Sequence, residues 1–311
     1  MTTDDDTRAS LPAMAEARRR FTEIVGELRP ELHRYCARMT GSVFDGEDIV
    51  QAALAKAYYA LSQMTEPPVL RPWLFGIAHN TAMDFLRRYD RKHVDVVSEV
   101  PDHAELEDAG VDPELVESAL TIFVQLPPVQ RSALILKDVL GHSLEDVATT
   151  LGISVGAVKG ALSRARANVS PKAISASAQN ADSFSAEELA NLKRYADLFN
   201  ARDWDGLRAL LGRESQLDLV SRAKQRAADA RYYDRYAEII QTEDIRAEPG
   251  VVDGVLAIAM YRPAASSVPT YFVLLEWSGS RVTLIRDFRY VPYIASGARF
   301  SRTPTDNTNH P

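Results

Sequence analysis

The sequence predicts a multidomain chain in which two all-α domains precede an α+β domain. Apolar residues recur at helical spacing over residues 15–93 and again over residues 119–170. Segments rich in β-branched and aromatic residues appear only beyond residue 215. Two stretches of different composition, residues 94–118 and 171–184, separate these blocks and are typical of linkers.

Composition favours a cytoplasmic protein from a reducing compartment. The chain has 311 residues, 46% of them apolar, and a net charge of −7. Its single cysteine, Cys36, excludes a disulfide framework, and the polar, acidic N-terminus lacks the apolar core of a signal peptide. No apolar run is long enough to span a membrane. We expect no membrane segment, metal or cofactor, and disorder at residues 1–14 and 297–311.

The first helical block contains two helices with distinctive polar residues. Residues 45–61 predict a helix that starts with Asp45, Glu47 and Asp48, which suit a helix N-terminus but would equally form an acidic docking surface for a basic partner. Residues 71–92 predict a second helix opened by a proline. Its outward ridge carries Asn80, Asp84, Arg87 and Arg88, at spacing that allows either local ion pairs or a nucleic-acid face.

An acidic linker follows at residues 94–118. Residues 94–130 hold nine carboxylates and no lysine or arginine. Such a run can be a solvated spacer, or it can mimic phosphates in a positively charged channel.

Residues 143–166 predict a helix-turn-helix. Ser143 and Ser154 are positioned as N-caps, Gly152 supplies the turn, and apolar residues line one face of each helix. The second helix carries its basic residues on the other faces, as a helix that lies in a DNA groove does. A helical hairpin with a solvated basic face is the structural alternative.

The C-terminal block, residues 185–296, predicts an α+β domain with a curved antiparallel sheet. Helices are expected at 185–200, where Ser185 and Glu188 form a capping box, and at 203–211, capped by Asp203. Strands are expected at 216–221, 251–262, 270–277 and 281–291, with a hairpin turn between the last two.

Three motifs in the helical part resemble the extracytoplasmic-function (group 4) sigma-70 factors of bacterial RNA polymerase. Residues 44–51 read FDGEDIVQ and resemble region 2.2, and residues 71–88 read RPWLFGIAHNTAMDFLRR and resemble regions 2.3 to 2.4. Residues 126–141 read LPPVQRSALILKDVLG and, with the helix-turn-helix, resemble region 4. Residues 15–93 would then be the region 2 domain (σ2) and residues 119–170 the region 4 domain (σ4).

The resemblance implies binding to core RNA polymerase and promoter DNA, with contact residues in each motif. For polymerase these are Asp45, Glu47, Asp48, Ile49 and Gln51. For the −10 element they are Trp73, His79, Asn80, Asp84, Arg87 and Arg88. For the −35 element they are Ser154, Lys159, Gly160, Ser163, Arg164 and Arg166. Gly160 and Ala161 replace the Ser and Arg that relatives often carry, so the promoter sequence does not follow by analogy.

The C-terminal block resembles the SnoaL-like, NTF2-like cone through residues 200–211, NARDWDGLRALL, and 282–290, VTLIRDFRY. The resemblance implies a fused domain that regulates the sigma factor in cis through contact with the sigma domains. The same fold also houses enzymes, but we expect no catalysis from this domain. A candidate small-molecule pocket would comprise Trp204, Tyr232, Tyr236, Trp277 and Asp287.

Two alternatives stay open: a SnoaL-type enzyme, or a ligand-sensing repressor, either one carrying a DNA-binding helix-turn-helix. An enzyme of this fold needs an acid or base in its cone, for which Asp218, Asp253 and Asp287 are candidates, with Tyr232, Tyr233 and Tyr236 as donors. Neither alternative requires the motifs at residues 44–51 and 71–88.

Overall fold

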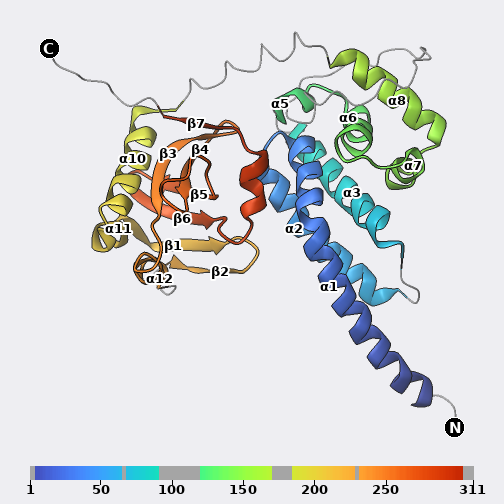
Figure 1. The fold of residues 1–311 in the computed structure, drawn as a ribbon, viewed down its shortest axis with the longest axis horizontal. Coiled ribbons are helices and arrows are strands. Elements are labelled where there is room, and N and C mark those ends of the chain that lie inside the picture. The colour runs from blue at the N-terminus through green and yellow to red at the C-terminus, as the bar shows by residue number, and fades with distance from the viewer. Residues whose placement is uncertain (1–3, 65–67, 91–119, 170–183, 228–230, 304–311) are drawn as a thin grey trace. The chain divides into compact units, whose positions relative to one another are not determined.

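The computed structural model describes residues 4–64, 68–90, 120–169, 184–227 and 231–303 (Figure 1). The chain divides into two compact units, Met1–Ser175 and Ala176–Pro311. The linkers expected at 94–118 and 171–184 lie outside the described residues except at residue 184.

Unit 1 is entirely helical. Its elements are α1 (Asp4–Thr40), α2 (Val43–Gln63), α3 (Leu70–Asp90), α5 (Leu120–Phe123), α6 (Pro128–Leu134), the π-helical turn η1 (Ile135–Val139), α7 (Leu144–Leu151) and α8 (Val155–Asn168). Helix α1 begins at Asp4, within the stretch of residues 1–14 that was expected to be disordered. Acidic residues at its start suit the helix dipole, and strong helix formers follow over residues 13–20.

One hydrophobic cluster joins both predicted helical domains of unit 1. Side chains from α1, α2 and α3 pack with side chains from α6, η1, α7 and α8, including Tyr35, Phe75, Leu134, Ile135 and Val158. All five are fully buried or nearly so. The region 2 and region 4 segments therefore share a core in this structure.

Unit 2 contains helices and one mixed sheet. The helices are α10 (Ala186–Asn200), α11 (Trp204–Leu210), α12 (Tyr232–Ile239) and the 3-10 turn η4 (Pro292–Gly297). The strands are β1 (Leu211–Leu219), β2 (Ala223–Arg226), β3 (Arg246–Val252), β4 (Val255–Tyr261), β5 (Tyr271–Ser278), β6 (Arg281–Asp287) and β7 (Phe300–Arg302). Their order in the sheet is β2-β1-β6-β5-β4-β3-β7, and α10 packs on β3 and β4 (Figure 1).

The sequence predicted an antiparallel sheet, but the sheet is mixed, because β1 and β6 pair in parallel. The segment from β2 to β5 intervenes in the sequence between these two strands, so local patterns do not reveal their pairing. Helices packed on a curved mixed sheet still give the cone architecture that the sequence predicted.

Three further expectations for unit 2 are corrected. The single strand expected at 251–262 is the end of β3, a turn and β4, since Asp253 and Gly254 have φ of 49° and 83° and form a two-residue hairpin turn. The helix expected at 203–211 ends one residue earlier, where Leu211 starts β1. Within the tail expected to be disordered from residue 297, residues 300–302 form β7, which pairs with β3, and residues 304–311 lie outside the described residues.

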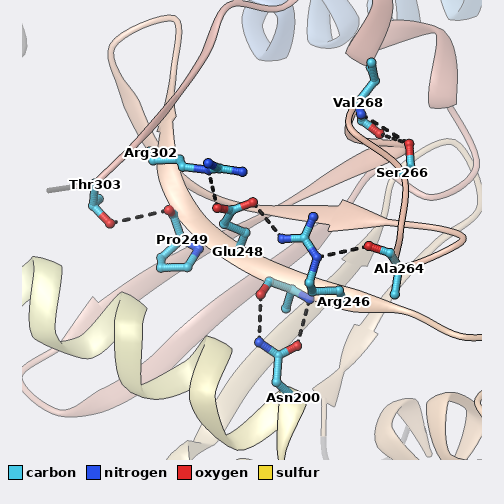
Figure 2. Close-up of polar contacts among 10 residues, drawn as sticks. Asn200, Arg246, Glu248, Pro249, Ala264, Ser266, Val268, Arg302 and Thr303 are labelled. Atoms are coloured by element: carbon cyan, nitrogen blue, oxygen red, sulfur yellow. Dashed lines mark hydrogen bonds and ion pairs between the residues drawn. The ribbon is translucent and has the colours of Figure 1, made fainter. Parts of the chain in front are cut away.

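Polar contacts fix both sides of β3 (Figure 2). Asn200 at the end of α10 accepts from the Ala247 amide at 2.9 Å and donates to its carbonyl at 2.8 Å. Glu248 pairs with Arg246 at 2.8 Å and with Arg302 of β7. Thr303 donates to the Pro249 carbonyl at 3.4 Å. These contacts explain why a short polar segment after η4 is ordered on the sheet.

Candidate nucleic-acid interface and the C-terminal unit

The helix-turn-helix forms as the sequence predicted. Ser143 accepts a hydrogen bond from the Asp146 amide at 3.0 Å, and Ser154 accepts one from the Ala157 amide at 3.1 Å. Gly152 has φ of 67°, the left-handed conformation that its place after α7 requires. Val158 and Leu162 are buried, which turns the opposite side of α8 outward.

The predicted −35 residues differ in their exposure. Ser154 and Lys159 are exposed, while Gly160, Ser163 and Arg164 are half-buried. The Arg164 guanidinium lies close to Gly160, about 3.7 Å from where a Cβ would stand. A Cβ at position 160 would therefore make an ordinary van der Waals contact with Arg164.

Arg166 makes an internal ion pair. Its Nε and Nη2 donate to the two carboxylate oxygens of Asp138 at 2.9 and 2.8 Å, and Asp138 is buried. This bidentate pair links α8 to η1. Arg166 thus orients the helix, while Lys159 and Arg164 are the basic residues on its outer side.

The ridge predicted on α3 is confirmed, because Asn80, Asp84, Arg87 and Arg88 are all exposed. Asp84 stands 4.0 Å from both Lys56 and Arg87. Exposed pairs at that separation contribute little to stability, so the ridge is open to a partner.

The other two predicted −10 residues lie elsewhere. Trp73 is half-buried against the core of unit 1. His79 is buried, and its Nδ1 lies 2.9 Å from the Tyr35 hydroxyl and 3.1 Å from that of Ser132. Burial lowers the pKa of His79 to about 4, so the ring is neutral at pH 7. This network joins α1 and α3 to α6.

Two more polar contacts join the region 2 and region 4 segments, and sequence patterns did not reveal them. Arg131 of α6 is buried and donates to the Met39 carbonyl of α1, and to the carbonyls of Val124 and Leu126 at 2.7 and 2.9 Å. Glu31 of α1 lies 3.2 Å from His142 and also pairs with Arg71. Arg131 lies in a helix that begins at Pro128, and nothing in the local sequence indicates that this arginine is buried.

The acidic motif at the start of α2 has an accessible and a buried side. Asp45, Asp48 and Gln51 are half-buried, whereas Glu47 and Ile49 are buried. Glu47 forms an ion pair with Arg29 of α1 and accepts from Gln51 at 3.4 Å. Glu47 and Ile49 therefore hold α2 against α1, and the other three face outward in part.

In unit 2, Tyr232 and Tyr236 both donate hydrogen bonds to one buried aspartate, Asp287. The Asp287 carboxylate is fully buried and accepts hydrogen bonds from Tyr232 at 2.8 Å and Tyr236 at 3.1 Å. Arg289 donates to it through Nε at 2.7 Å and through its backbone amide at 2.9 Å. Burial and the Asp287 charge raise the pKa of both tyrosines well above their usual value.

The remaining candidates in unit 2 are dispersed. Trp204 packs edge-on against Phe199 at 5.6 Å, and Trp277 packs against the same core. Asp218 is buried between Lys224 and Arg286, each 3.4 Å away. Asp253 lies in the β3–β4 turn, where it accepts from the Arg299 amide at 3.1 Å, and Tyr233 donates to Tyr195 at 3.3 Å.

Within the described ranges, no group of three or more His, Cys, Asp or Glu side chains could hold a metal ion. No helix within those ranges combines the length and apolarity needed to cross a membrane.

Family models match both helical segments. The model of Sigma-70 region 2 matches residues 24–92, and that of Sigma-70, region 4 matches residues 117–169. The chain is 31% identical to the RNA polymerase sigma factor CarQ of Myxococcus xanthus, over 45% of this chain and 80% of CarQ. It is 33% identical to the ECF RNA polymerase sigma factor SigG of Mycobacterium tuberculosis, over 64% of this chain and 61% of SigG. The chain belongs to the extracytoplasmic-function sigma-70 family.

Solved structures of sigma factors are also similar. One is the sigma factor RpoE in complex with the anti-sigma factor NepR from Bartonella quintana, with 25% identity and a TM-score of 0.39, covering 50% of this chain and 98% of that one. Another is the extracytoplasmic function sigma factor SigJ of Mycobacterium tuberculosis, with 20% identity and a TM-score of 0.33, covering 86% of this chain and 95% of that one.

Proposed function

We propose that this chain binds core RNA polymerase in the cytoplasm and directs it to specific promoters. The observation that carries the proposal is the pair of accessible polar surfaces, one on α3 and one on α8, that fall within the two matched sigma regions. Exposed basic side chains on each are suited to phosphates, and Asn80 and Arg164 are suited to base edges.

Asp45, Asp48 and Gln51 are proposed to contact core polymerase. They stand at the accessible start of α2, whereas Glu47 and Ile49 support the same turn from within. Carboxylates in this position attract a basic surface on the partner.

The −10 element is proposed to be read by the ridge of α3, with Asn80 for bases and Arg87 and Arg88 for phosphates. Asp84 orients the neighbouring basic residues, as its separation of 4.0 Å from Arg87 supports. Trp73 and His79 serve this surface through their packing beneath it.

The −35 element is proposed to be read by Lys159 and Arg164, with Ser154, Gly160 and Ser163 lying along the same side of the helix-turn-helix. Arg166 supports this surface through its ion pair with Asp138. Losing a base-edge contact costs about 1–3 kcal/mol of discrimination.

Unit 2 is proposed to regulate the sigma segments in cis without catalysing a reaction. The buried Asp287 carboxylate is engaged by Tyr232, Tyr236 and Arg289, which supports a structural aspartate in place of a general base. The tether of residues 171–184 gives unit 2 a local concentration of order millimolar near unit 1, enough to sustain a weak contact.

The test of the sigma activity is in vitro transcription with core polymerase. Asp45→Lys with Asp48→Lys should weaken polymerase binding, whereas the control Glu187→Lys, a single charge reversal at an exposed residue of α10, should not. Lys159→Ala and Arg164→Ala should each weaken −35-dependent transcription, and Asn80→Ala should change the preference at the −10 element. Unchanged polymerase affinity and promoter ranking in these variants would refute the assignments.

The test of the cis-regulatory role is deletion of residues 185–311. Transcription by the shortened and full chains is compared, and small-angle scattering of the free proteins reports the separation of the region 2 and region 4 segments. A change in both readouts supports regulation by unit 2. Equal activity with equal separation contradicts it.

A further inference from the structure

A cavity of about 260 Å³ opens in unit 2 between β1, α12 and the residues after β6. Leu217 and Leu219 of β1 supply an apolar wall, and Tyr232 and Tyr290 add aromatic rings. Only Tyr232 among the five pocket residues expected from the sequence lines it. The cavity is therefore distinct from the site that the sequence suggested.

Several charged groups at this cavity are already engaged by protein partners. Asp234 accepts from Arg231 at 3.2 Å and also pairs with Arg208. Arg289 is bound to Asp287, and its guanidinium lies 5.1 Å from the centre of the Tyr232 ring. These groups shape the cavity but have little capacity left for a ligand.

Arg235 and Glu238 differ from these charged groups in their exposure and in their ion pairing. Both line the cavity from α12, and both are exposed. Across the part of the chain that the structure describes, neither forms an ion pair, with each other or with a third group. Their spacing of three residues places them on one helix face, and an arginine that precedes a glutamate is the less favourable order for a local pair.

We propose that this cavity binds a small zwitterion with an apolar side chain, an α-amino acid of the phenylalanine type. Arg235 would receive the carboxylate, Glu238 the ammonium group, and the wall of Leu217, Leu219 and Tyr290 the side chain. An organic acid without an amine would leave Glu238 without a cationic partner and would place two carboxylates near each other. An amine without a carboxylate would leave Arg235 without an anionic partner and would place two cations near each other. The cavity lies just below the range of about 300–1,000 Å³ typical of drug-sized ligands, which favours a ligand of this size.

The experiment is isothermal titration calorimetry on the full chain with four probes. L-phenylalanine has all three features, 3-phenylpropionate lacks the amine, phenethylamine lacks the carboxylate, and glycine lacks the side chain. We expect saturable binding of phenylalanine and at least about tenfold weaker binding of each other probe, as expected for loss of a charged hydrogen bond or of apolar contact.

Two variants and a control locate the site. Arg235→Gln and Glu238→Gln should each weaken phenylalanine binding about tenfold, and Glu238→Gln should leave 3-phenylpropionate binding unchanged or improve it. Arg194→Gln, an exposed arginine on α10, should change nothing. Thermal unfolding confirms that each variant is folded.

Absence of phenylalanine binding, or equal affinity for phenylalanine and 3-phenylpropionate, would overturn the proposal. So would retained affinity in both site variants. Because the calorimetry uses neither polymerase nor DNA, failure here leaves the proposed sigma activity untouched, and failure of the transcription assays leaves this site untouched.

Discussion

Gly46 lies where the start of α2 crosses α1. A Cβ at this position would stand 2.6 Å from the Ala37 amide nitrogen and 2.7 Å from its Cα, closer than real contacts allow. The neighbouring atoms are backbone, so they cannot turn aside. We expect Gly46→Ala to lower the free energy of unfolding by about 1–3 kcal/mol, measured by urea denaturation of the full chain.

Gly26→Ala is the matched control, because nothing lies within 4 Å of a Cβ at that position of α1. There the substitution should raise stability by about 0.5–1 kcal/mol through helix propensity. If the two variants are equally stable, the close approach of α1 and α2 is not what requires glycine.

Asp287 anchors the core of unit 2 through its charge. Asp287→Asn would leave the Arg289 guanidinium, whose side chain is only 11% exposed, without its anion. Removing one partner of such a buried pair costs about 3–5 kcal/mol. We expect a markedly lower melting temperature for unit 2 by calorimetry. Asp205→Asn, whose carboxylate is 94% exposed, should change the melting temperature little, and a similar loss in both variants would contradict a special role for Asp287.

At single residues, sequence patterns predicted polarity but not burial. Glu47 and His79 were assigned to binding surfaces because they are polar members of motifs. The structure buries both, Glu47 against Arg29 and His79 against Tyr35 and Ser132. Their partners are 18 to 53 residues away, so no local spacing could indicate the pairs.

At the level of elements, the sequence predicted well those features that depend on neighbouring residues. The caps at Ser143, Ser154, Ser185 and Asp203 are all confirmed, since a cap depends on residues only three positions apart. Helix α12 was missed because its buried tyrosines also suit a strand. The parallel β1–β6 pairing and β7 depend on distant partners.

The joint between α1, α3 and α6 should weaken in acid. Burial lowers the pKa of His79 from 6.5 to about 4, so the unfolded chain binds its proton first as pH falls. The stability contributed by this group is present above pH 6.5 and is lost between pH 6.5 and about 4, to an extent of order 3 kcal/mol. His33, whose pKa is also lowered by burial, should add a loss of the same sign.

The measurement is urea denaturation of the full chain and of His79→Asn at several pH values. The variant should be less stable at pH 7 but should lose less stability on acidification. Parallel curves for the two proteins would show that His79 titrates normally in the folded chain.

At the scale of the whole molecule, the proposed function has the region 2 and region 4 segments separate to reach the −10 and −35 elements, and the core that they share in unit 1 opposes that separation. Tyr35→Phe removes the hydroxyl that lies 2.9 Å from His79 and 2.5 Å from Ser132, at a cost of about 1 kcal/mol to the interface. We expect apparent affinity for core polymerase to rise by up to about fivefold, as measured by fluorescence titration. Tyr58→Phe, at a ring that is half exposed, should leave the affinity unchanged. A fall in affinity for Tyr35→Phe would contradict the inference that the shared core opposes polymerase binding.

The hydrophobic cluster shared by the two sigma segments has a consequence for how this chain can vary. The contacts within this cluster contribute to the resistance of unit 1 to heat. Under the proposed function, the region 2 and region 4 segments separate on the promoter, so the same contacts would be broken when polymerase and DNA are engaged. Melting temperature and polymerase affinity should therefore change in opposite directions across a series of substitutions along this interface. Under the proposed function, a sequence with the highest melting temperature would have the lowest polymerase affinity. The strength of this interface is therefore limited by the need to initiate transcription.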